Sequence, residues 1–308
     1  MKKIHLLSVL HNSMSVKIIE ALIECRDDWL MNNIEKPVLV LGATGKTGSR
    51  VATGLADQGV AVRTASRHGS QVRFDWDDHT TYARALAGTR AVYLIPPVMR
   101  MDFAGIVSDF LDQAERAGVG HVTFLSAYGM QHASAELGLR AVELDLLDRS
   151  ALTHSFIRPA WFMQNFSESF LAPVDDTIVV PNADGAEAYV AVEDIANVAA
   201  ATLADPVAHA GAAYAPTGPE ALNVTQAAEI ISEATGRPIT YCAIDQDAWI
   251  EAMSAAGVPH DYTVILRLLT STVAGGNGSR PNEDVRAVTG RAPISFEEFA
   301  THTADTWK

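Results

Sequence analysis

The chain has 308 residues, of which 48% are hydrophobic and 19% charged, a balance typical of a globular protein with a sizeable core. Its formal net charge of −14, with no run of Lys or Arg, argues against nucleic acid or an anionic membrane as a partner. An anionic small molecule would therefore have to be held by backbone N–H groups, a helix N-terminus and a few placed cations.

The segment 1–36 is predicted to be an N-terminal extension. Residues 14–31 could form an amphipathic helix, or Met31 could be the natural start of the protein. The first apolar stretch is interrupted by His5 and Ser8 and lacks a signal-peptidase site, so we expect no export. No apolar run reaches the length of a membrane span, and we expect a cytoplasmic protein.

Cysteine and histidine usage predicts neither a disulfide framework nor a metal site. Cys25 and Cys242 form no C-x-x-C pair and are expected to be reduced, buried thiols. The ten histidines show no H-x-x-x-H or H-E-x-x-H spacing, which is the usual helical pattern of metal ligands.

Apolar runs alternate with amphipathic stretches between residues 37 and 160. Strands are predicted at residues 37–41, 60–65, 72–74, 91–95, 121–125 and 155–157. Helices are predicted at residues 49–57, 80–86, 103–117 and 135–149. Short connections between alternating strands and helices form right-handed crossovers. The pattern predicts an α/β Rossmann fold for residues 37–160, a doubly wound parallel sheet with helices on both faces.

The pattern is looser in residues 161–308, which are predicted to form a smaller α/β substrate lobe interleaved with the sheet. Strands are expected at residues 177–180, 188–190 and 213–215. Helices are expected at residues 192–203, 224–235 and 295–303. Asn223 is expected to cap the second of these helices, because its side chain can accept a hydrogen bond from the first helical turn.

A glycine-rich loop lies directly between the first strand and the first helix. Glycine permits positive φ and removes the Cβ that would block a diphosphate, while the helix N-terminus offers free N–H groups. We therefore predict a dinucleotide-binding loop, in preference to a simple tight turn. The loop residues predicted to contact the cofactor are Gly42, Thr44, Gly45, Lys46, Thr47 and Gly48.

The end of the second strand indicates which dinucleotide is bound. An acidic residue there would bind the ribose 2′-OH of NAD, whereas arginine suits the 2′-phosphate of NADP. The sequence has Ser66 and Arg67 and no acid at this place, so we predict NADP(H). Lys46 adds positive charge on the same side, and a plain surface arginine is the alternative interpretation of Arg67.

The ends of the third and fourth strands contribute further expected cofactor contacts. Asp75 could accept a hydrogen bond from the adenine amino group with Trp76 beside the ring, or it could belong to a solvated acidic turn. Ile95, Pro96 and Pro97 end the fourth strand, where the backbone would pass the nicotinamide ribose, although a rigid turn explains them equally well.

Ser126 and Tyr128 follow the fifth strand, at the sheet edge where catalytic groups usually lie. Both are predicted to be catalytic: Tyr128 could protonate a developing alkoxide, and Ser126 would line the reacting end and contact the cofactor. The alternative is that Ser126 caps and Tyr128 packs. None of the seven tyrosines has a lysine four residues later. The common Tyr-x-x-x-Lys machinery is therefore absent, which favours acceptors that need no strong acid.

The stretch after the sixth strand predicts a substrate wall. Pro159 gives a rigid exit from the strand and is expected to lie near the cofactor. The substrate contacts predicted here are Trp161, Phe162, Gln164 and Asn165, which combine aromatic rings with amide anchors. The alternative interpretation is that these residues form ordinary hydrophobic core between the two parts of the chain.

These motifs together resemble the NmrA-like family of atypical short-chain dehydrogenases/reductases, near the ergot-alkaloid and NAD(P)H:quinone or azo reductases. The resemblance is carried by Gly42-Ala-Thr-Gly-x-x-Gly48, Ser66-Arg67, Leu125-Ser126-Ala127, Glu143, Ile157-Arg158-Pro159, Phe162-Met-x-Asn165-Phe166, Val192-x-Asp194-Ile-Ala196 and Val288-Thr-Gly290-Arg-x-Pro293. Many members carry a lysine four residues before the position of Glu143. Here Leu139 and then Arg140 stand there, which puts a lysine-dependent mechanism in doubt.

The resemblance implies an NADPH-dependent oxidoreductase, because members of the family reduce quinones, imines or dyes. We expect hydride transfer to a flat, apolar small molecule such as a quinone, imine or enone, by a monomer or homodimer. Other members sense NADP, so the alternative is a regulatory protein that binds the cofactor and a protein partner without turnover. An inert cofactor-binding paralogue is a third interpretation.

Overall fold

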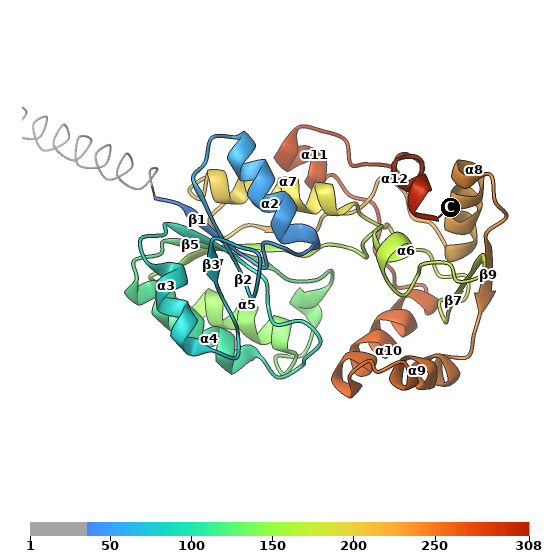
Figure 1. The fold of residues 1–308 in the computed structure, drawn as a ribbon, viewed down its shortest axis with the longest axis horizontal. Coiled ribbons are helices and arrows are strands. Elements are labelled where there is room, and N and C mark those ends of the chain that lie inside the picture. The colour runs from blue at the N-terminus through green and yellow to red at the C-terminus, as the bar shows by residue number, and fades with distance from the viewer. Residues whose placement is uncertain (1–35, 308) are drawn as a thin grey trace, which may run out of the picture.

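The computed structural model describes residues 36–307 and contains a seven-stranded parallel sheet (Figure 1). The predicted extension 1–36, with its helix at 14–31 or start at Met31, lies outside the described residues except for its last residue. The strands are β1 (Val38–Leu41), β2 (Val62–Ser66), β3 (Val72–Arg73), β4 (Ala91–Leu94), β5 (His121–Leu125), β6 (Thr153–Ile157) and β8 (Ala213–Tyr214). They follow the order β3-β2-β1-β4-β5-β6-β8, and every neighbouring pair is parallel.

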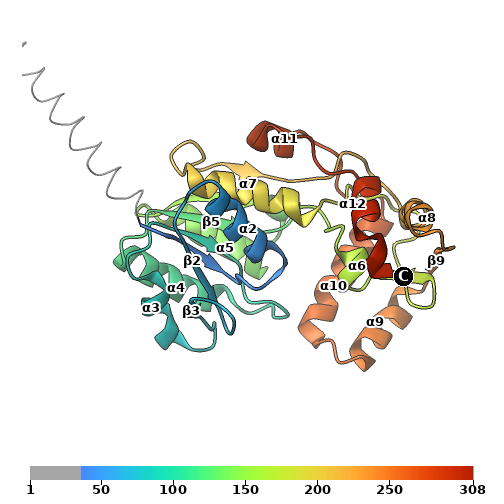
Figure 2. The ribbon, with the colours of Figure 1, turned by 45° about the horizontal axis from the view of Figure 1, so that its top comes forward.

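Helices cover both faces of the sheet, as the two ribbon views show (Figures 1 and 2). One face carries α2 (Lys46–Asp57), α7 (Val192–Ala204) and α11 (Asp284–Thr289). The other carries α3 (Tyr82–Leu86), α4 (Ala104–Arg116) and α5 (Gly138–Asp148). Each layer has its own buried hydrophobic cluster, because both faces of β1, β4 and β5 are covered. The predicted Rossmann fold is confirmed.

The last part of the chain forms a smaller lobe around a two-stranded parallel sheet (Figure 1). Its strands are β7 (Thr177–Val180) and β9 (Thr240–Ala243). Its helices are α6 (Asn165–Glu168), α8 (Val224–Thr235), α9 (Gln246–Ala255), α10 (His260–Ala274) and α12 (Phe296–Thr303). Three 3-10 helices complete the described elements, at His79–Thr81, Met130–His132 and Ala304–Trp307. None of the described helices is long and apolar enough to cross a membrane.

Two expectations about this lobe are wrong. Residues 188–190 are not a strand, because Val190 and Glu187 make only isolated bridges, to Phe162 and Leu222. Cys242 is exposed, since β9 pairs with β7 alone and lies at the edge of its small sheet. The N-cap prediction is confirmed: the side chain of Asn223 accepts a hydrogen bond from the N–H of Gln226, which completes a capping box.

A buried carboxylate ties the sheet to the C-terminal segment. Asp194 lies in the first turn of α7 with 4% of its surface exposed, and it accepts a hydrogen bond of 2.8 Å from the N–H of Ile294. Burial raises the pKa of Asp194 from 3.8 to about 6, although the N–H of Ile294 opposes the shift. The contact therefore holds residue 294 beside α7 at an electrostatic cost.

The Asp194→Asn variant is expected to change the pH dependence of stability. A carboxyl whose pKa is higher in the folded state binds its proton more tightly there, so its contribution to stability falls as the pH rises from 3.8 to about 6. The gain in unfolding free energy of the variant over the parent should therefore grow across that window and level off above it. Urea unfolding at several pH values measures it, with exposed Asp205→Asn at the other end of α7 as control. If the difference in unfolding free energy between Asp194→Asn and the parent did not change with pH, Asp194 would not have the raised pKa described.

Candidate functional site

The glycine loop brings the start of α2 unusually close to the end of β1. Gly42 adopts φ +60°, a conformation that L side chains rarely adopt. A Cβ on Gly48 would lie 2.3 Å from the carbonyl oxygen of Gly42, and one on Gly45 would lie 3.2 Å from the same oxygen. The first helical turn can therefore pack on the strand only because these positions lack a side chain.

The start of α2 leaves backbone donors available to a ligand. Its N-cap is Gly45, which offers no side-chain cap. Within residues 36–307, the N–H groups of Lys46, Thr47 and Gly48 find no acceptor, and the first one to do so is that of Ser49, 3.1 Å from the oxygen of Gly45. Free amides, a positive helix end and the missing Cβ atoms together fit an anionic diphosphate.

The end of β2 lies beside this loop. The N–H of Ala43 donates to the oxygen of Ala65 over 3.2 Å, and a Cβ on Gly69 would lie 3.5 Å from Cγ2 of Thr44. The hydroxyl of Ser66 is used within its own turn, where it contacts the carbonyl oxygen of His68 and the hydroxyl of Ser70. Arg67 is exposed, so its guanidinium is free to reach a ligand at this corner.

Asp75 and Trp76 take part in local packing. One oxygen of the Asp75 carboxylate accepts the N–H of Asp77 over 3.2 Å, which closes a turn. The ring of Trp76 packs edge-on against Phe74, with 4.9 Å between centroids, and lies over the core under α3 and α4. An adenine contact of Asp75 stays a prediction.

The segment after β4 covers the glycine loop and then becomes exposed. A Cβ on Gly42 would lie 3.0 Å from Cδ1 of Ile95, so this side chain lies directly over the loop. Pro96 is half-buried and Pro97 is buried. Val98 and Met99, which come next, are 75% and 52% exposed.

Ser126 belongs to a buried polar cluster at the ends of β5 and β6. Its hydroxyl donates a hydrogen bond of 2.7 Å to Oε1 of Glu143, whose side chain on α5 is fully buried. Arg158 donates to both oxygens of Glu143, over 2.8 and 3.0 Å. Arg140 donates to Oε2 over 2.9 Å. The structure thus joins Ser126 to two guanidinium groups through one carboxylate.

The cluster keeps Glu143 ionised. Burial alone would raise the pKa of this carboxyl, but the hydrogen bonds from Arg158, Ser126 and Arg140 outweigh it and hold the pKa below its ordinary value. Because Ser126 donates its only proton to Glu143, it presents an acceptor oxygen to any ligand. Tyr128 is 39% exposed, and its backbone N–H donates to the oxygen of buried Pro159 over 3.0 Å. The sequence marked Arg140, Glu143 and Arg158 only as positions compared with the family and assigned them no role in the site. The three-residue spacing of Arg140 and Glu143 on one helix was the signal for their pairing.

The predicted substrate residues do not share one wall. Trp161 packs on the core of the lobe, edge-on to Phe170 at 5.6 Å between centroids, whereas Phe162 joins the cluster under α7. Gln164 is buried and both ends of its amide are used: it donates to Glu193 and accepts the N–H of Val192 at the start of α7, each over 3.0 Å. Asn165 begins α6 and is half-buried.

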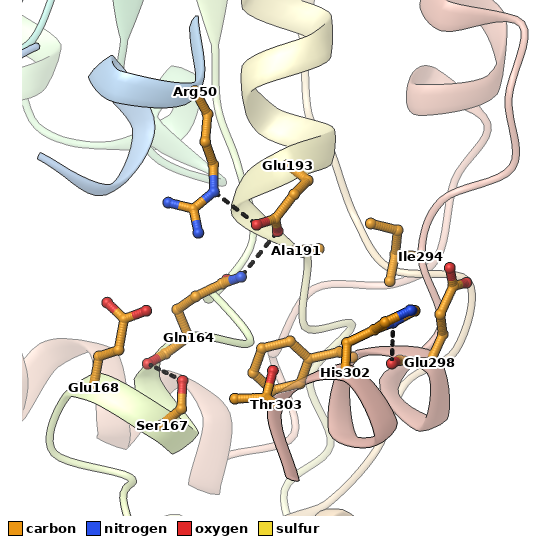
Figure 3. Close-up of a pocket in the computed structure, with 11 residues that line it drawn as sticks. Arg50, Gln164, Ser167, Glu168, Ala191, Glu193, Ile294, Glu298, His302 and Thr303 are labelled. Atoms are coloured by element: carbon orange, nitrogen blue, oxygen red, sulfur yellow. Dashed lines mark hydrogen bonds and ion pairs between the residues drawn. The ribbon is translucent and has the colours of Figure 1, made fainter. Parts of the chain in front are cut away.

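A cavity of about 250 Å³ lies between α2, α6, α7 and α12 (Figure 3). Arg50 and Gln164 both point toward Glu193 in it, with Arg50 at 2.6 Å, and His302 lines the opposite side (Figure 3). Beside it, Nζ of Lys46 lies 3.4 Å from a carboxylate oxygen of Glu168. The cavity is charged and is lined by neither Trp161 nor Phe162, so it is not the flat apolar pocket that the sequence predicts.

No group of three or more His, Cys, Asp or Glu residues suited to a metal ion occurs between residues 36 and 307. The parallel sheet with its glycine loop places the molecule in the Rossmann class. Residues 34–266 match the model of the NmrA-like family, and the chain belongs to that family.

Named relatives align along nearly all of the chain. The uncharacterized oxidoreductase YesF of Bacillus subtilis is 32% identical over 282 residues, which cover 89% of this chain and 97% of that protein. Agroclavine dehydrogenase of Claviceps fusiformis is 29% identical over 287 residues, covering 88% and 98%. The NADPH-dependent quinone oxidoreductase QOR2 of Escherichia coli, solved with NADPH, superposes with a TM-score of 0.69 at 20% identity, covering 86% of this chain and 99% of that one.

Alanine at two positions of α2 is expected to change stability in opposite directions. Gly48→Ala forces the Cβ into the backbone of Gly42 and should destabilise the protein by about 1–3 kcal/mol, the usual cost of overpacking. Gly54→Ala places its Cβ 3.6 Å from that of Ala200, an ordinary contact, and should stabilise by about 0.5–1 kcal/mol through helix propensity. Urea unfolding measures both, and equal effects at the two sites would contradict the packing described for the loop.

Proposed function

We propose that the protein is an NADPH-dependent reductase that passes a hydride to a flat, apolar small molecule. The observation that carries the proposal is the glycine loop, whose N–H groups at Lys46, Thr47 and Gly48 have no acceptor within the described residues and are available to a diphosphate. The relatives support an oxidoreductase, because YesF and agroclavine dehydrogenase bear the names of such enzymes and QOR2 was solved with NADPH.

Arg67 is the residue proposed to select NADPH. It follows β2 beside the glycine loop and is exposed, and a guanidinium can hold a 2′-phosphate through two parallel hydrogen bonds. Neither neighbour, Ser66 or His68, is an acid that would favour the free 2′-OH of NADH. Ile95 would then lie against the middle of the cofactor, because it covers the loop at Gly42.

Exposed apolar side chains support a flat, apolar acceptor. Val98 and Met99 follow β4, and Tyr128 follows β5, so all three lie beyond the carboxyl edge of the sheet. Val264 and Leu268 are 45% and 52% exposed and lie one turn apart on α10. Neighbouring large apolar side chains that together form a patch open to solvent are typical of surfaces that bind an apolar partner or ligand.

Ser126 and Tyr128, at the carboxyl edge of the sheet, have different roles in the proposed reaction. When bound, the cofactor supplies the hydride. Ser126 accepts a hydrogen bond and is not the proton donor, because its own proton is held by Glu143. Tyr128 is open to water, so it or the solvent supplies the proton that a reduced acceptor needs.

The proposed reductase is a cytoplasmic monomer or homodimer. In it residues 37–160 bind the cofactor and residues 161–308 provide the other side of the substrate site, with Trp161 and Asn165 as its proposed contacts.

Arg67→Ala is expected to reduce the preference for NADPH over NADH. Loss of charge-assisted hydrogen bonds worth about 1.5–3 kcal/mol should weaken NADPH binding roughly 10- to 100-fold and leave NADH binding nearly unchanged. Titration of both cofactors by the enhancement of dihydronicotinamide fluorescence measures the two affinities. Arg84→Ala on α3, also an exposed arginine, is the matched control. An unchanged ratio of the two affinities in Arg67→Ala would refute the assignment.

The purified protein is expected to oxidise NADPH in the presence of quinones or cyclic imines. Absorbance of NADPH, followed against a panel of quinones, imines and enones, gives kcat and KM for each acceptor. Tight NADPH binding without turnover on any acceptor would overturn the reductase and support the regulatory alternative.

A further inference from the structure

We propose that Arg140 makes the site selective for acceptors that are anionic or become anionic on reduction, such as quinones, over cationic iminium ions. The inference rests on the proposed reductase function and names its substrate class. It starts from an imbalance of charge in the cluster around Glu143, which holds two guanidinium groups and one carboxylate.

The imbalance is not offset by other ion pairs. Among the described residues, Glu143 is the only carboxylate within ion-pair distance of either Arg140 or Arg158. The pKa of Glu143 is held below its ordinary value, so the cluster carries two positive charges and one negative charge at neutral pH. One positive charge is therefore left over.

The two arginine side chains are less deeply buried than the carboxylate. The Glu143 side chain is fully buried, whereas the side chains of Arg140 and Arg158 keep 18% and 13% of their surface exposed. Solvent therefore reaches the arginine side chains but not the carboxylate of Glu143. A charge that is only partly solvated acts strongly on its surroundings, because little water screens it.

The cluster lies at the reacting edge of the sheet. Ser126 follows β5 and Arg158 follows β6, and Arg140 is the third residue of α5, which starts beyond the carboxyl end of β5 (Figure 1). Gly138, which begins α5, packs against Phe103 of the segment after β4, with only 2.8 Å between a Cβ placed there and the ring. No acidic residue stands in the first turn of α5, so the positive end of its dipole adds to the field of Arg140.

This field distinguishes the two acceptor classes through the charge each gains. A hydride carries two electrons from NADPH, which is oxidised to NADP⁺. A quinone that receives it becomes a hydroquinone monoanion and then takes one proton from Tyr128 or water, whereas an iminium ion becomes a neutral amine. The positive charge of Arg140 stabilises the developing anion and repels the iminium ion before it reacts.

Binding of a matched pair of naphthoquinones tests the proposal without turnover. Lawsone is an anion at neutral pH and menadione is neutral, and both quench tryptophan fluorescence. Arg140→Gln should weaken lawsone binding about ten-fold or more and leave menadione binding within about two-fold, the effect of losing one charge-assisted contact. Arg140→Lys, which keeps the charge, should retain most of the lawsone affinity. Glu143 keeps Arg158 and Ser126 as donors in Arg140→Gln, so the fold is expected to persist.

Steady-state kinetics supplies the second readout. Arg140→Gln should lower kcat with menadione, because the lost charge acts on the developing anion, and should raise kcat/KM for an N-methyl dihydroisoquinolinium ion. Arg149→Gln is the control, since Arg149 follows the other end of α5 and pairs with Asp112 and Asp145. Equal lawsone affinity in the parent and Arg140→Gln would overturn the inference even in an active reductase. Absence of turnover with every acceptor would instead overturn the proposed function, and lawsone binding would then still decide whether Arg140 forms an anion site.

Discussion

The close approach of Gly48 to the backbone of Gly42 is the contact on which the site depends. It lets α2 start directly over the end of β1, and this places the free N–H groups of Lys46 and Thr47 at the sheet edge. The same packing holds α2 against α7. The helix that follows the glycine loop and the later helix α7 therefore belong to one hydrophobic layer on the same face of the sheet. A protein of net charge −14 can thus present local positive potential through backbone alone.

A second source of positive potential lies on the opposite face of the sheet. Glu143 is fully buried there, and such a charge is tolerated only with partners that match its geometry. Arg158 meets it with two hydrogen bonds from the end of β6, and Arg140 adds a third from its own helix. The carboxyl ends of β1, β5 and β6 therefore share a positive potential, although α2 and α5 lie on opposite faces of the sheet.

The elements that depend on local sequence pattern could be predicted from the sequence. The unbroken apolar run before Gly42 and the glycine spacing allow few alternatives, so the strand and the helix lie close to where they were expected. The helix begins at Lys46, three residues before its predicted start, because the last residues of the glycine loop form its first turn. The pairing of Glu143 with Arg158 joins a residue of α5 to the residue that follows β6, and only packing brings them together. The pair α9 and α10 escaped prediction because tertiary contacts, such as those of Trp249 and Leu266, stabilise it. Residues 188–190 show that a short apolar run fits buried irregular chain as well as a strand.

Residues 192–214 return to the sheet late in the chain, and this affects how the protein folds during its synthesis. β8 pairs with β6 and α7 covers the face of the sheet opposite α5, so the cluster around Val38 and Val40 stays open until both have been synthesised. During translation, the hydrophobic surface of the early strands stays uncovered until residues 192–214 have left the ribosome, after the whole first half of the chain. Contacts between segments so far apart in the chain slow folding and prolong the exposure of strand edges. The first half of this protein therefore completes its hydrophobic layer only with residues 192–214.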